Sequence, residues 1–232
     1  MTSDFSFLPD IQACVFDAYG TLFDVTRVAR LEDAALGDKH AALSELWRAK
    51  QLQYSWLRGL GGRHADFWQV TGEALDFAMA ALGLEDPALR ERLMNLYLRI
   101  DAYPEVRGSL EALRACGLKT AILSNGTPSM LAAAIENSGL GHALDQVLSV
   151  ERAGVFKPHP SVYQLAVDSL GVPREQICFL SSNGWDAWSA KAFGFRVLWC
   201  NRTGQQPETL PWTPDGELRD LSVLAQHFAA VS

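Results

Sequence analysis

The sequence predicts an α/β fold with a doubly wound, mostly parallel sheet. Short apolar runs bounded by turn residues alternate with longer helical patterns along most of the 232 residues, as successive βαβ units do. The region from residue 25 to 103 interrupts this alternation, because it has helical periodicity and no convincing strand. We therefore expect a core domain formed by residues 1–24 and 104–232, with a helical cap domain, residues 25–103, inserted after the first strand.

Five apolar runs are the candidate strands of the core, and helical patterns lie between most of them. The strands are expected at Ala13 to Asp17, Lys119 to Ser124, Gln146 to Ser149, Gln176 to Ser181 and Arg196 to Cys200. The helices are expected at Val106 to Cys116, Pro128 to Ser138, Ser161 to Leu170 and Trp185 to Phe193. After Gly204 the sequence contains three prolines, so we expect irregular structure up to a last helix near Leu221 to Ala230.

The cap is expected to consist of helices placed over the carboxyl edge of the sheet, where open parallel sheets bind their ligands. Its clearest helical pattern runs from Ala41 to Leu57. A glycine-rich turn at residues 59–62 follows, and two further helices are expected at Ala65 to Leu82 and Pro87 to Ile100.

Composition argues against nucleic acid and membrane as partners and predicts the location of the protein in the cell. A formal net charge of -7 and a pI near 5.2 argue against nucleic acid, which binds to strongly cationic surfaces. The sequence has no apolar run of about 18 residues, and its first ten residues contain no Lys, Arg or signal-peptide core. We therefore expect a cytoplasmic protein that binds neither nucleic acid nor membrane. None of the five histidines falls in a metal-ligand or triad arrangement.

Four groups of polar residues interrupt or follow apolar runs. They are Asp17 with Thr21, Ser124-Asn125-Gly126, Lys157-Pro158, and Ser181-Ser182-Asn183-Gly184-Trp185-Asp186. Any one of these groups alone is more typical of a turn or a helix cap than of a catalytic site. Together and in this order they indicate one site, because a parallel sheet brings the ends of several strands to the same crevice.

With these groups the chain resembles the haloacid dehalogenase superfamily, and within it the (S)-2-haloacid dehalogenases. The resemblance covers nearly the whole chain and implies a Rossmann-like core sheet, a homodimer and no cofactor. It rests on the stretches Asp17-Ala18-Tyr19-Gly20-Thr21-Leu22-Phe23-Asp24, Leu46-Trp47-Arg48-Ala49-Lys50-Gln51-Leu52-Gln53-Tyr54, Leu123-Ser124-Asn125-Gly126, Lys157-Pro158 with Tyr163, and Ser181-Ser182-Asn183-Gly184-Trp185-Asp186.

The resemblance implies a small-molecule substrate, a short 2-haloalkanoic acid, and a covalent route. Asp17 attacks C2, the halide leaves, and water hydrolyses the resulting ester to a 2-hydroxyacid. Lys157 keeps the nucleophile ionised, Thr21 holds it in place, and few competing hydrogen bonds are expected on its carboxylate. The groups expected to position Lys157 and the hydrolytic water are Ser181, Asn183 and Asp186. Which of them activates the water stays open.

The remaining implied roles concern the halide and the substrate. Arg48, Asn125 and Trp185 are expected to receive the departing anion. For the substrate carboxylate we expect the Ser124 hydroxyl and backbone amides near Ala18 and Asn125. An apolar wall around the alkyl group is expected from Tyr19, Leu52 and Phe67, and Tyr163 is expected to reach Asp17 or Lys157.

Three alternatives remain open at this point. A magnesium-dependent phosphatase of the same superfamily needs a second carboxylic acid, and Tyr19 stands where that acid is expected. A magnesium-dependent phosphonate-cleaving enzyme lacks that acid, but the cap stretch from Leu46 to Tyr54 argues against it. A non-catalytic binding protein on this scaffold is expected to have lost Asp17, Lys157 or Asp186, and all three are present.

Overall fold

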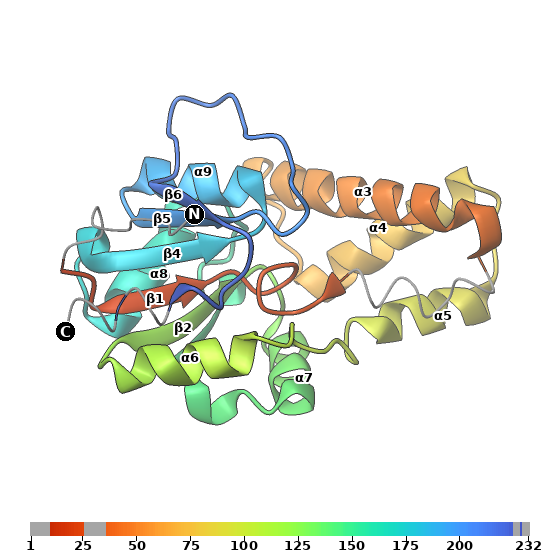
Figure 1. Cartoon of the computed structure of the whole chain (residues 1–232). Coiled ribbons are helices and arrows are strands. Elements are labelled where there is room, and N and C mark those ends of the chain that lie inside the picture. The colour runs from red at the N-terminus through yellow and green to blue at the C-terminus, as the bar shows by residue number, and fades with distance from the viewer. Residues whose placement is uncertain (1–9, 26–35, 225–227, 229–232) are drawn as a thin grey trace.

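The computed structural model of the chain describes residues 10–25, 36–224 and 228, and the predicted α/β class with a parallel sheet is confirmed. Six parallel strands form one sheet in the order β3-β2-β1-β4-β5-β6 (Figure 1). The strands are β1 (Ala13–Phe16), β2 (Lys119–Ser124), β3 (Gln146–Ser149), β4 (Ile177–Ser181), β5 (Arg196–Cys200) and β6 (Gly216–Leu218).

The first strand lies in the middle of the sheet and sets the position of the crevice. From β1 the chain builds β2 and β3 on one side and β4, β5 and β6 on the other. Such a reversal of strand order leaves room for a ligand at the carboxyl ends of the central strands. The strand ends one residue earlier than predicted, so Asp17 is the first residue after β1, and its N–H still donates to Leu180 O at 2.9 Å.

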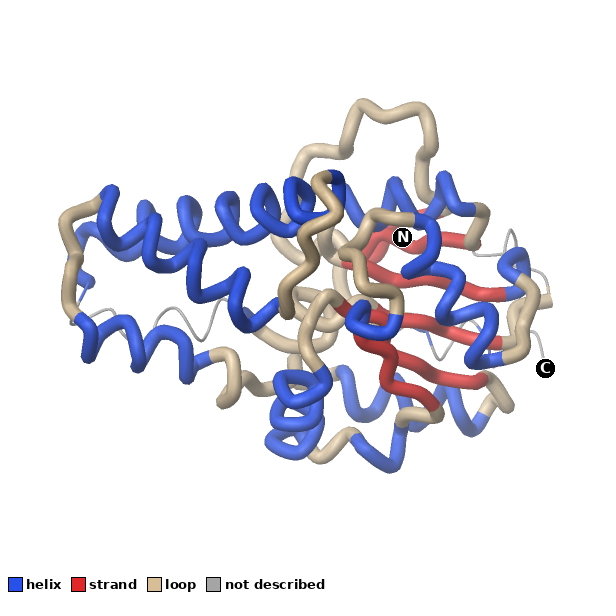
Figure 2. Tube along the Cα trace, turned by 180° about the vertical axis from the view of Figure 1, so that it is seen from behind, coloured by secondary structure: helices blue, strands red, loops and turns tan. Residues whose placement is uncertain are grey.

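Helices cover both faces of the sheet. They are α6 (Val106–Ala115), α7 (Pro128–Ser138), α8 (Pro160–Leu170) and α9 (Gly184–Phe193). Figure 1 shows α6 in front of the sheet and α8 behind it, and the reverse view in Figure 2 shows the same layers. The four central strands β1, β2, β4 and β5 are therefore buried almost throughout, and their apolar side chains belong to the main core together with those of the covering helices.

Three further helices lie beyond the carboxyl edge of the sheet, on the side to which the strand arrows point in Figure 1. They are α3 (His40–Leu60), α4 (Phe67–Ala81) and α5 (Pro87–Leu96). Asp66 and Asp86 cap α4 and α5 by accepting hydrogen bonds from N–H groups of the first turn. The three helices share a smaller apolar cluster of their own that includes Leu43, Leu75 and Leu93. The boundary between a core and a cap domain stays a prediction.

The tail departs from the predicted irregular structure in one place. Residues 216–218 form β6, a short strand that pairs with β5 at the edge of the sheet. Three residues are too few to give a recognisable alternation of apolar and polar side chains. The predicted last helix near Leu221 to Ala230 falls partly outside the described residues. Within the described part of the chain, no helix is long and apolar enough to cross a membrane.

Candidate active site

A buried ammonium joins two carboxylates at the carboxyl edge of the sheet. Lys157 Nζ lies 3.1 Å from Asp17 Oδ1 and 2.8 Å from Asp186 Oδ2. Lys157 is 1% exposed and Asp186 is fully buried, while 7% of Asp17 remains exposed. Burial alone lowers the pKa of Lys157, but the two carboxylates together raise it above its usual value. Burial raises the pKa of Asp186, and Lys157 opposes that rise. The predicted ion pair of Asp17 with Lys157 is therefore present.

The other oxygen of Asp17 accepts from three side chains. Asn183 Nδ2 donates to Asp17 Oδ2 at 2.8 Å, the Thr21 hydroxyl at 3.3 Å and the Ser181 hydroxyl at 3.4 Å. The expectation of few hydrogen bonds on this carboxylate does not match the structure, because donors converge from the loops after both β1 and β4. Ser181 and Asn183 thus contact Asp17 itself rather than Lys157. The carboxylate is fixed in orientation, with one donor on Oδ1 and three on Oδ2.

Tyr163 contacts neither of its two predicted partners, Asp17 and Lys157. Its hydroxyl donates to Asp186 Oδ1 at 2.7 Å, and its ring is fully buried between Phe179, Phe193 and Phe195. Burial raises the pKa of Tyr163 well above its usual value, so the phenol keeps its proton and remains a donor. Tyr163 therefore holds Asp186 in place, and Asp186 in turn holds Lys157.

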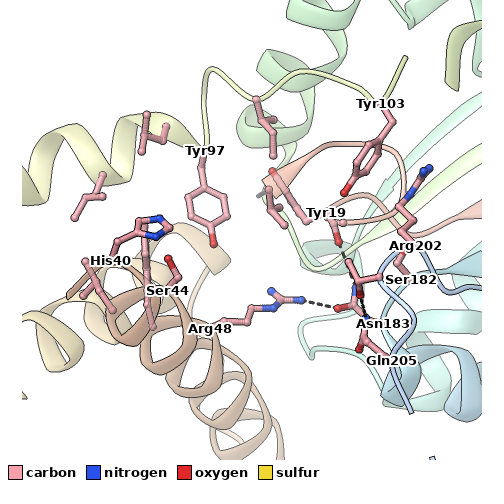
Figure 3. Close-up of a pocket in the computed structure, with 18 of the residues that line it drawn as sticks. Tyr19, His40, Ser44, Arg48, Tyr97, Tyr103, Ser182, Asn183, Arg202 and Gln205 are labelled. Carbon is pink, nitrogen blue, oxygen red and sulfur yellow. Dashed lines mark hydrogen bonds between the residues drawn. The ribbon is translucent and has the colours of Figure 1, made fainter. Parts of the chain in front are cut away.

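Arg48 extends from α3 to the edge of the sheet. Its guanidinium donates to Asn183 Oδ1 at 3.0 Å, and the same amide donates to Asp17 (Figure 3). This residue is the predicted halide receiver, and the structure brings it within one side chain of the predicted nucleophile. A charged side chain from α3 thus reaches the loop after β4 and contacts a residue that binds Asp17.

Gln51 orients Arg48 and was missed from the sequence. Its Oε1 accepts from Arg48 Nη1 at 2.6 Å, and its Nε2 donates to Thr71 Oγ1 at 2.8 Å. Gln51 is fully buried, and the Thr71 hydroxyl donates onward to Phe67 O at 2.6 Å. Arg48 therefore connects to the backbone of α4 through an unbroken chain of hydrogen bonds. The spacing of three residues on one helix was the available signal, because such residues are neighbours on its surface.

The last residue of β2 and the turn after it present two of the predicted binding groups. Asn125 Oδ1 accepts from Lys157 N at 3.0 Å, so the Asn125 NH2 group is the end left to donate. Ser124 Oγ accepts from Gly126 N at 3.1 Å and keeps its own hydroxyl proton available. Both residues are buried. Ala18, fully buried after Asp17, has its carbonyl occupied by N–H groups of its own turn.

The predicted apolar wall is divided in the structure. Tyr19 lies against Gly126, where an added Cβ would be 2.9 Å from its ring. Phe67 is buried against Phe156, with ring centroids 6.0 Å apart, and Trp185 meets Trp56 edge to face at 5.7 Å. Leu52 is half-buried on α3. A cavity of about 470 Å³ beside Arg48 and Asn183 is lined by Tyr19 but not by Leu52, Phe67 or Trp185.

Tyr19 is unsuited to donate a proton during catalysis. Burial, followed by the neighbouring Tyr97 and Asp17, raises the pKa of its phenol well above the usual value. A reaction whose leaving group must be protonated therefore lacks an acid at this position. Among the described residues, no group of three or more His, Cys, Asp or Glu side chains is arranged to hold a metal ion.

Comparisons with known proteins agree with the fold and show the family. The family model of the haloacid dehalogenase-like hydrolases matches residues 11–194. The (S)-2-haloacid dehalogenase 1 of Pseudomonas sp. (strain CBS-3) is 48% identical over 218 residues, covering 93% of this chain and 96% of that protein. The (S)-2-haloacid dehalogenase 4A of Burkholderia cepacia is 47% identical over 199 residues, covering 85% of this chain and 86% of that protein.

A solved structure is similar over nearly the whole chain. It is the L-2-haloacid dehalogenase from Xanthobacter autotrophicus with chloropropionic acid covalently bound. The two structures superpose with a TM-score of 0.88 at 40% sequence identity, and the match covers 96% of this chain and 100% of that one.

Replacing Lys157 by Met is expected to destabilise the fold most strongly near neutral pH. The change leaves the Asp186 carboxylate buried without its cation, which typically costs about 3–5 kcal/mol. A carboxyl whose pKa is raised on folding binds its proton more tightly in the folded state, so acid relieves this cost. Urea unfolding should therefore show a smaller deficit at pH 5 than at pH 7. The exposed Lys119→Met serves as control. If Lys157→Met loses the same unfolding free energy at both pH values, the cost does not come from the buried Asp186 carboxylate.

Proposed function

The chain belongs to the haloacid dehalogenase-like hydrolases, and we propose that it hydrolyses short (S)-2-haloalkanoic acids to (R)-2-hydroxyacids and halide. The names of its relatives support this reaction. The observation that carries the proposal is the carboxylate of Asp17, held by a buried ammonium and linked through one amide to Arg48. This arrangement provides a fixed nucleophile and a cation placed to receive a departing anion.

The first step is attack of an Asp17 oxygen on C2, from the face opposite the halogen. A carbon–oxygen bond forms, the carbon–halogen bond breaks, and the halide leaves with the bonding electrons, so the configuration at C2 inverts. Lys157 offsets the charge of Asp17 without occupying both of its oxygens. A weakly hydrated carboxylate in a nearly closed site is a better nucleophile than one in water.

The departing halide meets donors from three parts of the chain. Arg48 supplies the positive charge, and Asn125 supplies its NH2 group. Trp185 offers an indole N–H that is buried and has no hydrogen-bond partner among the described residues. Donors that are already oriented stabilise the charge as it develops, at little cost in reorganisation. A halide ion needs no proton, so the lack of an acid at Tyr19 does not obstruct this step.

Water then attacks the carbonyl carbon of the Asp17 ester. The hydroxyacid leaves with one oxygen of Asp17, and Asp17 regains an oxygen from water. The oxygen of Asp17 that did not attack C2 is the carbonyl oxygen of the ester, and the donors already on that oxygen stabilise it as the oxyanion of the tetrahedral intermediate: Lys157 if it is Oδ1, or Ser181 and Asn183 if it is Oδ2. Asp186, held by Tyr163, keeps Lys157 in place throughout.

Substrate binding uses the remaining predicted groups. The Ser124 hydroxyl and backbone amides near Ala18 and Asn125 orient the carboxylate of the substrate. Tyr19, Leu52 and Phe67 are the proposed apolar surface around C3, the first alkyl carbon, and of the three only Tyr19 also lines the cavity beside Arg48.

We also propose that the protein acts in the cytoplasm as a homodimer. Large apolar side chains are exposed on α3 and α4, and they support an interface there: Trp56, Leu57, Leu60 and Phe77.

Halide release from a panel of haloacids tests the proposed function. We expect chloride from (S)-2-chloropropionate and from chloroacetate, little from the R enantiomer, and full activity in EDTA, because Lys157 supplies the cation beside Asp17. Ion chromatography measures the halide, and Asp17→Asn is the inactive control. Loss of activity in EDTA that Mg²⁺ restores, together with release of phosphate from a phosphate ester, contradicts the proposal and favours a phosphatase.

Replacing Gln51 by Leu is expected to lower kcat without unfolding the protein. The change removes the acceptor that orients Arg48, so the loss should be smaller than the roughly 100-fold that removal of a direct donor typically costs. Steady-state kinetics with (S)-2-chloropropionate separate kcat from KM. The exposed Gln53→Leu on the same helix is the matched control. An unchanged kcat in Gln51→Leu refutes the positioning role.

A further inference from the structure

The cavity beside Arg48 extends away from the nucleophile. Arg48 and Asn183 form one end of it, and α3 continues along it through Ser44 to His40 (Figure 3). Positions 40, 44 and 48 lie one above another on a helix, and the rise from position 40 to position 48 is about 12 Å. The helix α5 and the loops after β1, β4 and β5 complete the walls. At about 470 Å³ the cavity far exceeds the roughly 30 Å³ of a water molecule.

The walls of this cavity are predominantly apolar. They include Leu43, Trp47, Leu93, Leu96, Tyr97 and Ile100. The polar atoms of the two aromatic members are engaged elsewhere, because Trp47 Nε1 donates to Thr71 O and the Tyr97 hydroxyl accepts from Gln51. These rings therefore present carbon to the interior. The walls from α3 and α5 are thus largely apolar, while polar residues lie on the sheet side, at the end beside the predicted reaction site, and at His40 and Ser44 along α3.

Arg202, on the sheet side of the cavity, also has its charge compensated. Its guanidinium pairs with Glu105 at 2.7 Å, donates to Thr21 O at 2.8 Å and lies over the Tyr103 ring at 3.8 Å. Such a paired and stacked guanidinium adds no net charge to attract an anion. The cavity is therefore unsuited to hold a halide, which loses its hydration in apolar surroundings.

We propose that this cavity binds the alkyl chain of 2-haloalkanoic acids longer than propionate. The inference rests on the proposed function, and it extends the substrate class to unbranched acids of about six to eight carbons. With C2 at Asp17, the chain runs past Tyr19, beside the hydrogen bond between Arg48 and Asn183, and lies along α3 toward Ser44. Contacts between the cavity and the alkyl chain bind a part of the substrate that does not react, so they lower KM and have little effect on kcat.

A chain-length series with the wild-type protein is the first test. For (S)-2-bromopropionate, (S)-2-bromohexanoate and (S)-2-bromooctanoate, kcat/KM should rise about fourfold per methylene that enters the cavity, mostly through KM. A steep fall from propionate to hexanoate overturns the inference and leaves the proposed function standing. Absence of bromide release from all three acids overturns the proposed function itself.

Filling the cavity is the second test. Ser44→Phe should lower the ratio of kcat/KM for bromohexanoate to that for bromopropionate by about tenfold, because the new ring occupies the volume of the chain. The smaller Ser44→Leu should lower it less, and it replaces Ser44→Phe if that variant does not fold. Ala42→Phe places the same ring on the exposed face of α3 and should leave the ratio unchanged. If the ratio is unchanged in both Ser44 variants, whether or not kcat/KM falls equally for the two acids, the inference is overturned.

Discussion

A buried ammonium between two carboxylates is the contact on which the rest of the site depends. Lys157 comes from the loop before α8, Asp17 from the end of β1 and Asp186 from α9, so one cation joins three segments. Removing a charge from water is costly, and it is tolerated here because each carboxylate is itself held by hydrogen bonds. Asp186 accepts from Tyr163, and Asp17 accepts from the donors around Oδ2.

Asn183 connects this buried cluster to the helices beyond the sheet. Its amide donates to Asp17 and accepts from Arg48, so the proposed nucleophile and the proposed halide receiver share one side chain. Gln51 holds Arg48 from the other side through α4. The predicted reaction site therefore lies between two rigid supports, the sheet edge and the packed helices. The Asn183 amide that contacts Asp17 also lines the apolar cavity. The reaction and the proposed binding of the alkyl chain therefore use different residues on the two sides of Asn183.

Much of this arrangement follows from the sequence because parallel strands end at one edge. Asp17, Ser124 and Ser181 could be placed together from strand positions alone, and the resemblance added Arg48 from the cap. Pairings between side chains were less predictable. Tyr163 was expected at Asp17 or Lys157 and lies at Asp186, because its position on α8 is set by packing against aromatic rings. The spacing of three residues indicates a contact between Arg48 and Gln51, but the burial of Gln51 could not be predicted, since burial depends on contacts between α3 and α4 that periodicity does not specify.

A single-turnover reaction in ¹⁸O water tests most directly whether the ammonium-bound carboxylate is the nucleophile. Excess enzyme is mixed with (S)-2-chloropropionate, and the peptide that contains Asp17 is weighed by mass spectrometry. An ester route predicts one ¹⁸O atom in Asp17 and an unlabelled hydroxyacid after the first turnover, because water attacks the carbonyl carbon of Asp17. Label in the hydroxyacid and none in Asp17 would show direct attack of water on C2 and contradict the role assigned to Asp17.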